Sequence, residues 1–167
     1  MCGIVGIASK TNSVSEIITG LQALEYRGYD SSGIACSNLD NIHYQKSVGK
    51  ISNLIDQLNN NIIQGNTSIA HTRWATHGRP NRLNAHPFVK ENCALVHNGI
   101  VENYEDLISS YLLDTNKLES ETDTEIVAEI YSKLLTEFDP IEALMNLTKN
   151  IQGTYAFAFL VKGSNSI

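Results

Sequence analysis

Residues 1–24, MCGIVGIASKTNSVSEIITGLQAL, place a short apolar run directly before a segment with helical periodicity. The run at residues 4–8 predicts a strand, and the apolar residues that follow recur at the three- and four-residue spacing of one helix face. Ser13 and Glu16 have the spacing of a capping box, so the helix is expected to begin there. The chain is therefore predicted to open with a strand that leads into an amphipathic helix.

The remaining segments add strands and helices in groups. Polar residues 38–41 separate two strand-like runs and predict a hairpin, and Ser52 is expected to cap a helix that runs to residue 58. Further strands are predicted at residues 67–71, 93–97 and 153–161, and further helices at residues 104–112, 122–135 and from 140 onward, with caps at Asn103, Thr122 and Asp139. Because strands and helices are grouped rather than alternating, we expect an α+β fold with antiparallel sheets.

Composition narrows the function before any motif is considered. The chain has 167 residues, a length that suits one domain, and 12 Lys and Arg against 18 Asp and Glu, a net charge of −6. This acidic balance, without a run of basic residues, disfavours binding to nucleic acid or to a membrane surface. Apolar stretches fall short of the roughly 20 residues that cross a bilayer, and the N-terminus lacks a basic secretory signal. We expect a cytoplasmic protein that acts on small molecules.

Cys2 is the most informative of the three cysteines. If Met1 is removed, the thiol of Cys2 belongs to the N-terminal residue, and its own α-amine, with an ordinary pKa of about 7.7–8.0, lies within reach as a base. The alternative is that Cys2 is a small buried residue of an apolar run. Cys36 and Cys93 lie within predicted strands without basic neighbours and are expected to be free thiols of the core.

The segment IAHTRWATHGRP at residues 69–80 concentrates polar side chains after a predicted strand. The guanidinium fork of Arg73 suits bidentate capture of a carboxylate, and Trp74, Thr76 and His77 share its loop. The alternative is a solvated arginine beside a packed tryptophan. The histidines of the chain lack the spacing of a metal site, so no metal is expected.

VHNGIVEN at residues 96–103 supplies a second group of candidates. The side-chain amide of Asn98 and the backbone N–H of Gly99 can converge on one developing negative oxygen, as in an oxyanion hole, although Asn-Gly also forms ordinary turns. Asp123, in ETDTE, either favours the positive end of the helix that begins there or accepts a substrate ammonium group. Each motif alone leaves both interpretations open.

Six segments together resemble one family. MCGIVG, LEYRGYDSSG, AHTRWATHG, NAHPF, VHNGIVEN and ETDTE occur in the order and spacing of the glutaminase domain of glutamine–fructose-6-phosphate aminotransferases, also called glucosamine-6-phosphate synthases. These are class II glutamine amidotransferases of the N-terminal nucleophile hydrolase superfamily. HTRWATHG distinguishes them from purine-pathway amidotransferases, asparagine synthetases and glutamate synthases. The resemblance covers essentially the whole chain and implies a four-layer α-β-β-α sandwich of two antiparallel sheets.

The resemblance implies a reaction for three of the candidate residues. Cys2, exposed after removal of Met1, would attack the side-chain amide carbon of glutamine while Asn98 and Gly99 hold the oxyanion. Ammonia would leave, a γ-glutamyl thioester would remain on Cys2, and water activated by the α-amine would release glutamate. No cofactor is implied.

The other candidates are assigned to substrate binding by the same resemblance. Arg73 would bind the α-carboxylate of glutamine and Asp123 its α-ammonium group. Thr76 and His77 would line the same pocket, in a loop that closes over the substrate. Trp74 would lie at the domain boundary that gates the passage of ammonia.

Compared with that family, the chain is expected to be incomplete at its C-terminal end. We expect residues 1–167 to be one class II glutamine amidotransferase domain, without the sugar-isomerase domains that bind fructose 6-phosphate. In a full-length, homo-oligomeric enzyme its partners would be L-glutamine and those domains. Two alternatives remain open at this point: an inert fragment that binds only glutamine or a partner, and a glutaminase that serves another acceptor.

Overall fold

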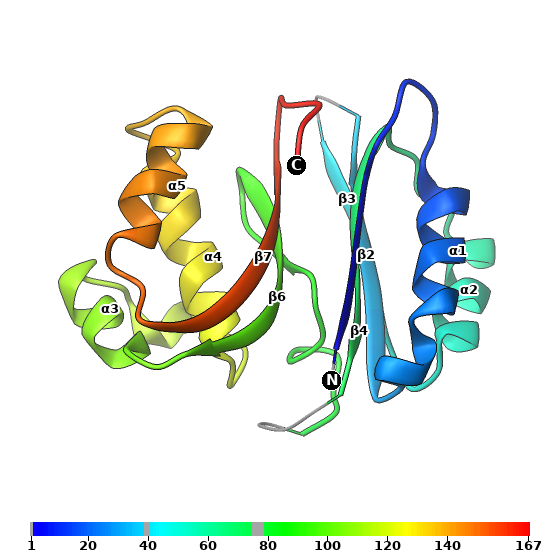
Figure 1. Cartoon of the computed structure of the whole chain (residues 1–167), viewed down its shortest axis with the longest axis horizontal. Coiled ribbons are helices and arrows are strands. Elements are labelled where there is room, and N and C mark those ends of the chain that lie inside the picture. Colours follow the sequence, from blue (N-terminus) through cyan, green and yellow to red (C-terminus); the bar gives the residue numbers. More distant parts are fainter. Residues whose placement is uncertain (1, 39–40, 75–78) are drawn as a thin grey trace.

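The computed structural model describes residues 2–38, 41–74 and 79–167 and has four layers (Figure 1). Helices cover the outer face of each of two sheets, and the sheets face each other in the middle. Every strand pair among these residues is antiparallel. The expected α-β-β-α sandwich is confirmed.

The first sheet has its strands in the order β1-β4-β2-β3. They cover Gly3–Ala8 (β1), Ser31–Ser37 (β2), Ile42–Val48 (β3) and Thr67–Arg73 (β4). β2 and β4 lie in the centre and are buried along their whole lengths. β1 pairs with β4 so that Gly3 lies opposite Thr72, which brings the beginning of the chain beside the end of β4.

The second sheet has its strands in the order β5-β6-β7. They cover Phe88–Val89 (β5), Cys93–Val101 (β6) and Gly153–Val161 (β7). β6 runs four residues beyond its predicted end, because β7 pairs along it and places Asn98 opposite Ala156 and Gly99 opposite Tyr155. Asn98 and Gly99 therefore lie within a strand, and the alternative of an ordinary Asn-Gly turn is wrong.

Helices form the two outer layers of the sandwich. The first sheet carries α1 (Val14–Ala23) and α2 (Ile51–Asn60), and the second carries α3 (Tyr104–Ser110), α4 (Asp123–Leu134) and α5 (Pro140–Thr148). Short 3-10 turns occur at Glu25–Arg27 (η1) and Thr115–Lys117 (η2). In the part of the chain that the structure describes, the helices are all too short or too polar to cross a membrane.

The helix caps are confirmed in position at Ser13, Asn103, Thr122 and Asp139, which are the N-cap residues of their helices. The cap predicted at Ser52 is wrong, because α2 already begins at Ile51 and its N-cap is Lys50. The Asp139 carboxylate accepts hydrogen bonds from two backbone N–H groups in the first turn of α5. The side chains of Ser13, Asn103 and Thr122, in contrast, make no capping hydrogen bond. Two of these side chains form hydrogen bonds with residues distant in the sequence instead: Ser13 donates to the Gly65 carbonyl, and Asn103 donates to the Asn150 carbonyl.

Side-chain alternation along the strands determines what enters the layer between the sheets. The apolar cluster in this layer consists of Ala35, Ile69, Ala94, Val96 and Leu160. Successive side chains of a strand point to opposite faces, so the residues between these positions face the helices. Counted in twos, His71 follows Ile69 on β4 and Asn98 follows Val96 on β6. One end of the layer is therefore polar.

Glu125 fastens the first turn of α4 to the segment before it. Its carboxylate, 5% exposed, pairs with Lys90 at 3.0 Å and accepts hydrogen bonds from the backbone N–H groups of Glu119 and Ser120. Burial raises the pKa of Glu125, but hydrogen bonds from Ser120, Lys90 and Glu119 outweigh this effect and hold the pKa below its usual value. The ionised form of Glu125 therefore stabilises the fold.

We predict that Glu125→Gln lowers the free energy of unfolding at pH 7 by about 1–3 kcal/mol. A carboxyl group with a lowered folded-state pKa stabilises the protein above its unfolded pKa, about 4.3 for glutamate, and that contribution is lost as the pH falls through the folded value. The difference between wild type and variant should therefore shrink below about pH 4. Urea unfolding at several pH values measures it.

The control for this prediction is Glu129→Gln. Glu129 also pairs with Lys90, at 2.9 Å, but its side chain is 37% exposed. Because exposed ion pairs contribute little, this variant should change the free energy of unfolding by less than about 0.5 kcal/mol. Equal losses in the two variants would contradict the role given to Glu125.

Candidate functional site

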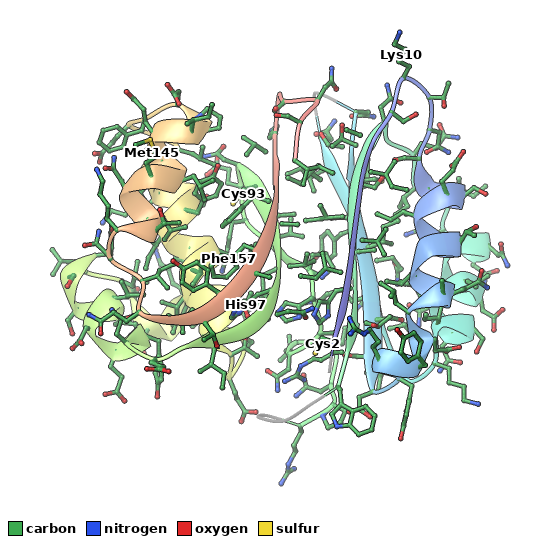
Figure 2. The ribbon with its side chains drawn as sticks, in the orientation of Figure 1. Cys2, Lys10, Cys93, His97, Met145 and Phe157 are labelled. Atoms are coloured by element: carbon green, nitrogen blue, oxygen red, sulfur yellow. The ribbon has the colours of Figure 1, made fainter. Side chains whose placement is uncertain are left out.

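Cys2 lies between the two sheets, immediately before β1 (Figure 2). Its half-buried thiol accepts a hydrogen bond from the backbone N–H of Trp74 at 3.3 Å. The antiparallel register, in which Gly3 lies opposite Thr72, brings Cys2 beside the end of β4, where Trp74 follows Arg73. The residue that follows β4 therefore contacts the candidate nucleophile.

Asn98 joins Cys2 from the opposite sheet. Its side-chain Nδ2 donates to the Cys2 carbonyl oxygen at 3.1 Å, and its Oδ1 lies 2.9 Å from Nε2 of His71. The next residue, Gly99, has φ +139°, a conformation that favours glycine. A Cβ at Gly99 would also collide with the Thr154 carbonyl oxygen on β7. Two independent backbone constraints therefore require glycine beside Asn98.

Arg73 is a buried cation at the end of β4. Arg73 as a whole residue is only 6% exposed, so the alternative of a solvated surface arginine is wrong. Burial lowers the pKa of Arg73, while Cys2, Asp30 and Asp123 act in the opposite direction. Because a guanidinium stays protonated in proteins, Arg73 presents a positive charge inside the protein.

Asp123 is the first residue of α4 and is tied to the end of β6. Its Oδ2 accepts a hydrogen bond from the backbone N–H of Val101 at 2.7 Å, and its Oδ1 accepts one from the Thr124 hydroxyl at 3.3 Å. Nδ1 of His97 lies 3.9 Å from the same Oδ1. The carboxylate is therefore fixed by strand and helix together.

Residues 25–30 support the chain at Arg73 and Trp74. Gly28 lies so close to this backbone that an added Cβ would be 2.6 Å from the Arg73 carbonyl carbon. The backbone N–H of Asp30 donates to the Arg73 carbonyl at 3.1 Å, and the Tyr29 ring meets the Trp74 ring edge-on, with centroids 5.5 Å apart. The YRGYD segment thus shapes the beginning of the predicted binding loop.

Most of the candidate site residues line one cavity of about 630 Å³. The predicted site residues on its wall are Cys2, Arg73, Trp74, Asn98, Gly99 and Asp123. Thr76 and His77, the remaining predicted site residues, lie outside the described part of the chain. Segments that are far apart in the sequence therefore contribute to a single cavity with a thiol, a cation and a carboxylate on its wall.

Sequence reasoning missed the apolar part of this wall. It is made by Ile100, Tyr104, Ile108, Leu118 and Ile126. Tyr104 and Ile108 are four residues apart on α3, a spacing that places them on one helix face. The helical periodicity was visible in the sequence, but nothing in it distinguishes a face that lines a cavity from one that packs against a core.

Three buried histidines, His71, His86 and His97, are placed close to the cavity. Burial lowers the pKa of His71 to about 4, and it also lowers the pKa values of His86 and His97. Among the described residues, His, Cys, Asp and Glu do not gather in groups of three or more that could hold a metal ion. The sequence analysis weighed these histidines only as metal ligands and so missed their contacts with Asn98 and Asp123.

Cys36 and Cys93 are core residues, as expected. Both are fully buried, and burial raises the pKa of each thiol to about 12. Buried thiols of this kind react slowly because little thiolate forms at neutral pH. Cys2, which is half-buried, is the accessible thiol among the described residues.

Comparison with known sequences finds one family. The family described as "Glutamine amidotransferase domain" matches residues 71–167 of this chain. A glutamine–fructose-6-phosphate aminotransferase (isomerizing) of Fusobacterium nucleatum is 46% identical over 165 residues, covering 97% of this chain and 27% of that protein. The enzyme of the same name from Clostridium perfringens is 41% identical over 162 residues, covering 96% and 26%. The chain spans about a quarter of the length of these curated relatives.

Solved structures share the fold. Glutamine phosphoribosylpyrophosphate amidotransferase from B. subtilis, in complex with ADP and GMP, has a TM-score of 0.82 and 23% identity, over 97% of this chain and 35% of that chain. The structure described as the allosteric regulatory enzyme of purine biosynthesis has a TM-score of 0.81 and 23% identity, over 97% and 36%. At these identities the similarity concerns the arrangement of layers and strands.

We predict that Gly99→Ala destabilises the protein more than Gly163→Ala. Both glycines have positive φ, +139° and +81°, but a Cβ at Gly163 would meet open space whereas one at Gly99 would meet β7. The clash should add about 1–3 kcal/mol to the loss. Urea unfolding of the two variants measures the difference in the free energy of unfolding. Similar losses in the two variants would contradict the prediction and show that the β7 backbone moves away from the added Cβ at little cost.

Proposed function

We propose, from the premise that this chain belongs to the glutamine amidotransferase domain family, that it hydrolyses the side-chain amide of L-glutamine to glutamate and ammonia. The observation that carries the proposal is one cavity wall shared by the Cys2 thiol, the buried Arg73 cation and the Asp123 carboxylate. Glutamine offers a complementary set of groups: an amide, an α-carboxylate and an α-ammonium group. Arg73 and Asp123 together are sufficient to pair with the two charged groups of glutamine and so to orient it.

Cys2 is the proposed nucleophile, acting after Met1 has been removed. The free α-amine of Cys2 takes the thiol proton, and Sγ bonds to the side-chain amide carbon of glutamine. The carbon–nitrogen bond breaks as the amine returns the proton to the departing ammonia, which leaves a γ-glutamyl thioester. Water then loses a proton to the same amine, attacks the thioester carbon, and releases glutamate and the thiol.

Asn98 and Gly99 are proposed to stabilise the negative oxygen that forms in both steps. The hydrogen bond from Asn98 Nδ2 to the Cys2 carbonyl supports this role, because it keeps the donor group beside the nucleophile residue. Two prearranged donors cost little reorganisation at the moment of reaction, which makes them effective in a partly enclosed site. Gly99 contributes its backbone N–H, and Asn98 contributes its side-chain amide.

Arg73 and Asp123 are proposed to bind the amino-acid end of glutamine. The guanidinium of Arg73 pairs with the α-carboxylate, and the anchored carboxylate of Asp123 accepts from the α-ammonium group. Thr76 and His77 are proposed to line the same pocket. Trp74, which is 43% exposed, is proposed to lie where ammonia leaves the site.

In a longer protein, the ammonia would serve a second reaction. The similar proteins from Fusobacterium nucleatum and Clostridium perfringens are named as glutamine–fructose-6-phosphate aminotransferases, and the chain covers about a quarter of each. We therefore propose that sugar-isomerase domains, in a homo-oligomeric cytoplasmic enzyme, use the ammonia to convert fructose 6-phosphate to glucosamine 6-phosphate. That conversion belongs to amino sugar biosynthesis.

Cys2→Ala should abolish the release of glutamate from glutamine, because it removes the nucleophile. Cys36→Ala is the matched control and should keep the activity, since that thiol is buried. Intact mass of the active protein should show that Met1 is absent, and an electrophilic glutamine analogue should label Cys2 alone. Activity in a chain that retains Met1, or in Cys2→Ala, would contradict the mechanism; a folded but inactive, unlabelled wild type would favour the inert fragment.

Arg73→Lys and Asp123→Asn should raise the KM for glutamine more than they lower kcat. Lysine keeps the positive charge but loses the second hydrogen bond to the carboxylate, and asparagine loses the charge that attracts the ammonium group. We expect increases in KM on the order of 10-fold for each, from the loss of about 1.4 kcal/mol of binding. Steady-state glutaminase kinetics measure both constants, and an unchanged KM in both variants would place the amino-acid end of the substrate elsewhere.

A further inference from the structure

A line of polar contacts runs from the nucleophile residue into the core behind it. Nδ2 of Asn98 donates to the Cys2 carbonyl at 3.1 Å, and Oδ1 of Asn98 lies 2.9 Å from Nε2 of His71. Nδ1 of His71 in turn lies 3.2 Å from Nδ1 of His86. Both rings are buried and meet edge to face, with centroids 4.2 Å apart. The proposed oxyanion donor is thus backed by two imidazoles that the proposed mechanism does not use.

Backbone carbonyls determine where the protons of this line lie. Nε2 of His71 is also 3.1 Å from the His97 carbonyl oxygen, and a carbonyl oxygen can only accept. Nε2 of His71 therefore carries a proton, which it directs at that carbonyl and at Oδ1 of Asn98. The opposite orientation of the Asn98 amide is excluded. It would point the amide oxygen at the Cys2 carbonyl oxygen and the amide N–H groups at the His71 N–H, and both contacts would be repulsive.

The two rings are neutral, which fixes their remaining nitrogens. Burial lowers the pKa of His71 to about 4 and the pKa of His86 well below its ordinary value; the positive charges of Arg73 and Lys46 also lower the pKa of His86. A neutral His71 with its proton on Nε2 has a bare Nδ1, so His86 must donate to it from its own Nδ1. Nε2 of His86 is then a bare acceptor, and it has no partner among the described residues.

We propose that His71 is a positioning residue of the oxyanion hole and that His86 sets the tautomer of His71. This inference rests on the proposed glutaminase function. His71 holds Oδ1 of Asn98 while the Cys2 carbonyl holds one Nδ2 hydrogen, which leaves the second Nδ2 hydrogen for the amide oxygen of the substrate. The donor is oriented before the substrate arrives, and a donor prepared in this way acts on the transition state rather than on binding.

The tautomers can be measured without any assay of activity. Protein labelled with ¹⁵N-histidine should show, in long-range ¹H–¹⁵N correlation spectra, His71 protonated on Nε2 and His86 on Nδ1, both neutral between about pH 5 and pH 8. Spectra of His71→Gln and His86→Asn assign the signals. A His71 ring that is protonated on Nδ1, or charged at pH 7, would falsify the proposal.

Kinetics test whether the arrangement matters for catalysis. His71→Met removes the donor and should lower kcat for glutamine hydrolysis at least about 10-fold, toward the loss on the order of 100 to 1,000-fold expected for Asn98→Ala. KM should stay within about threefold, since the donor acts on the transition state. His71→Gln keeps an N–H near the position of Nε2 and should restore most of the activity. The double variant His71→Met with Asn98→Ala should be no slower than Asn98→Ala alone.

Other outcomes separate the inference from the function on which it rests. If Cys2→Ala is inactive while folded His71→Met keeps its wild-type kcat, only the positioning role is wrong. If Cys2→Ala is fully active, the glutaminase mechanism is wrong, and the tautomers are still decided by the spectra. Should His71→Met fail to fold, His86→Leu and His86→Asn decide: only the leucine variant, which lacks the donor to Nδ1 of His71, should lower kcat.

Discussion

The site depends on the way in which two facing sheets share one layer of side chains. Because side chains alternate along a strand, only every second residue enters this layer. Apolar residues such as Ile69 and Val96 fill its middle, and the residues two positions further on, His71 and Asn98, are polar and touch each other. The candidate site is therefore the polar end of a hydrophobic core, and the pairing registers of β4 and β6 determine where it lies.

Burial then sets the chemical state of the groups at that end. Removal from water lowers the pKa of His71 to about 4, so its ring is a neutral donor, and raises the pKa of the Cys36 thiol to about 12, so that thiol stays protonated. Arg73 lies in the same interior but has the acidic groups of Asp30 and Asp123 nearby. Burial thus keeps the His71 ring and the Cys36 thiol uncharged, whereas the guanidinium of Arg73 stays charged in the same interior.

Periodicity in the sequence was sufficient for most of the fold. The paired strands Ser31–Ser37 and Ile42–Val48, the strand Gly3–Ala8 and the aromatic strand Gly153–Val161 lie close to where the apolar and aromatic runs of the sequence predict them. The end of β6 was mispredicted because Asn-Gly favours turns locally, while pairing with β7 overrides that preference. Ser13 is the N-cap residue of α1 as predicted, but its hydroxyl makes no capping hydrogen bond and instead donates to the Gly65 carbonyl, 52 residues away along the chain.

By itself, the sequence determined which residues are candidates for chemistry and which faces are apolar. Cys2, Arg73, Asn98 and Asp123 stand out by residue type and by the motifs around them. Only the tertiary structure decided that they border one cavity and that His71 backs Asn98 as a neutral donor. The reason is physical: contacts between distant strands and the loss of water around a side chain depend on packing, and neither is a property of a local segment.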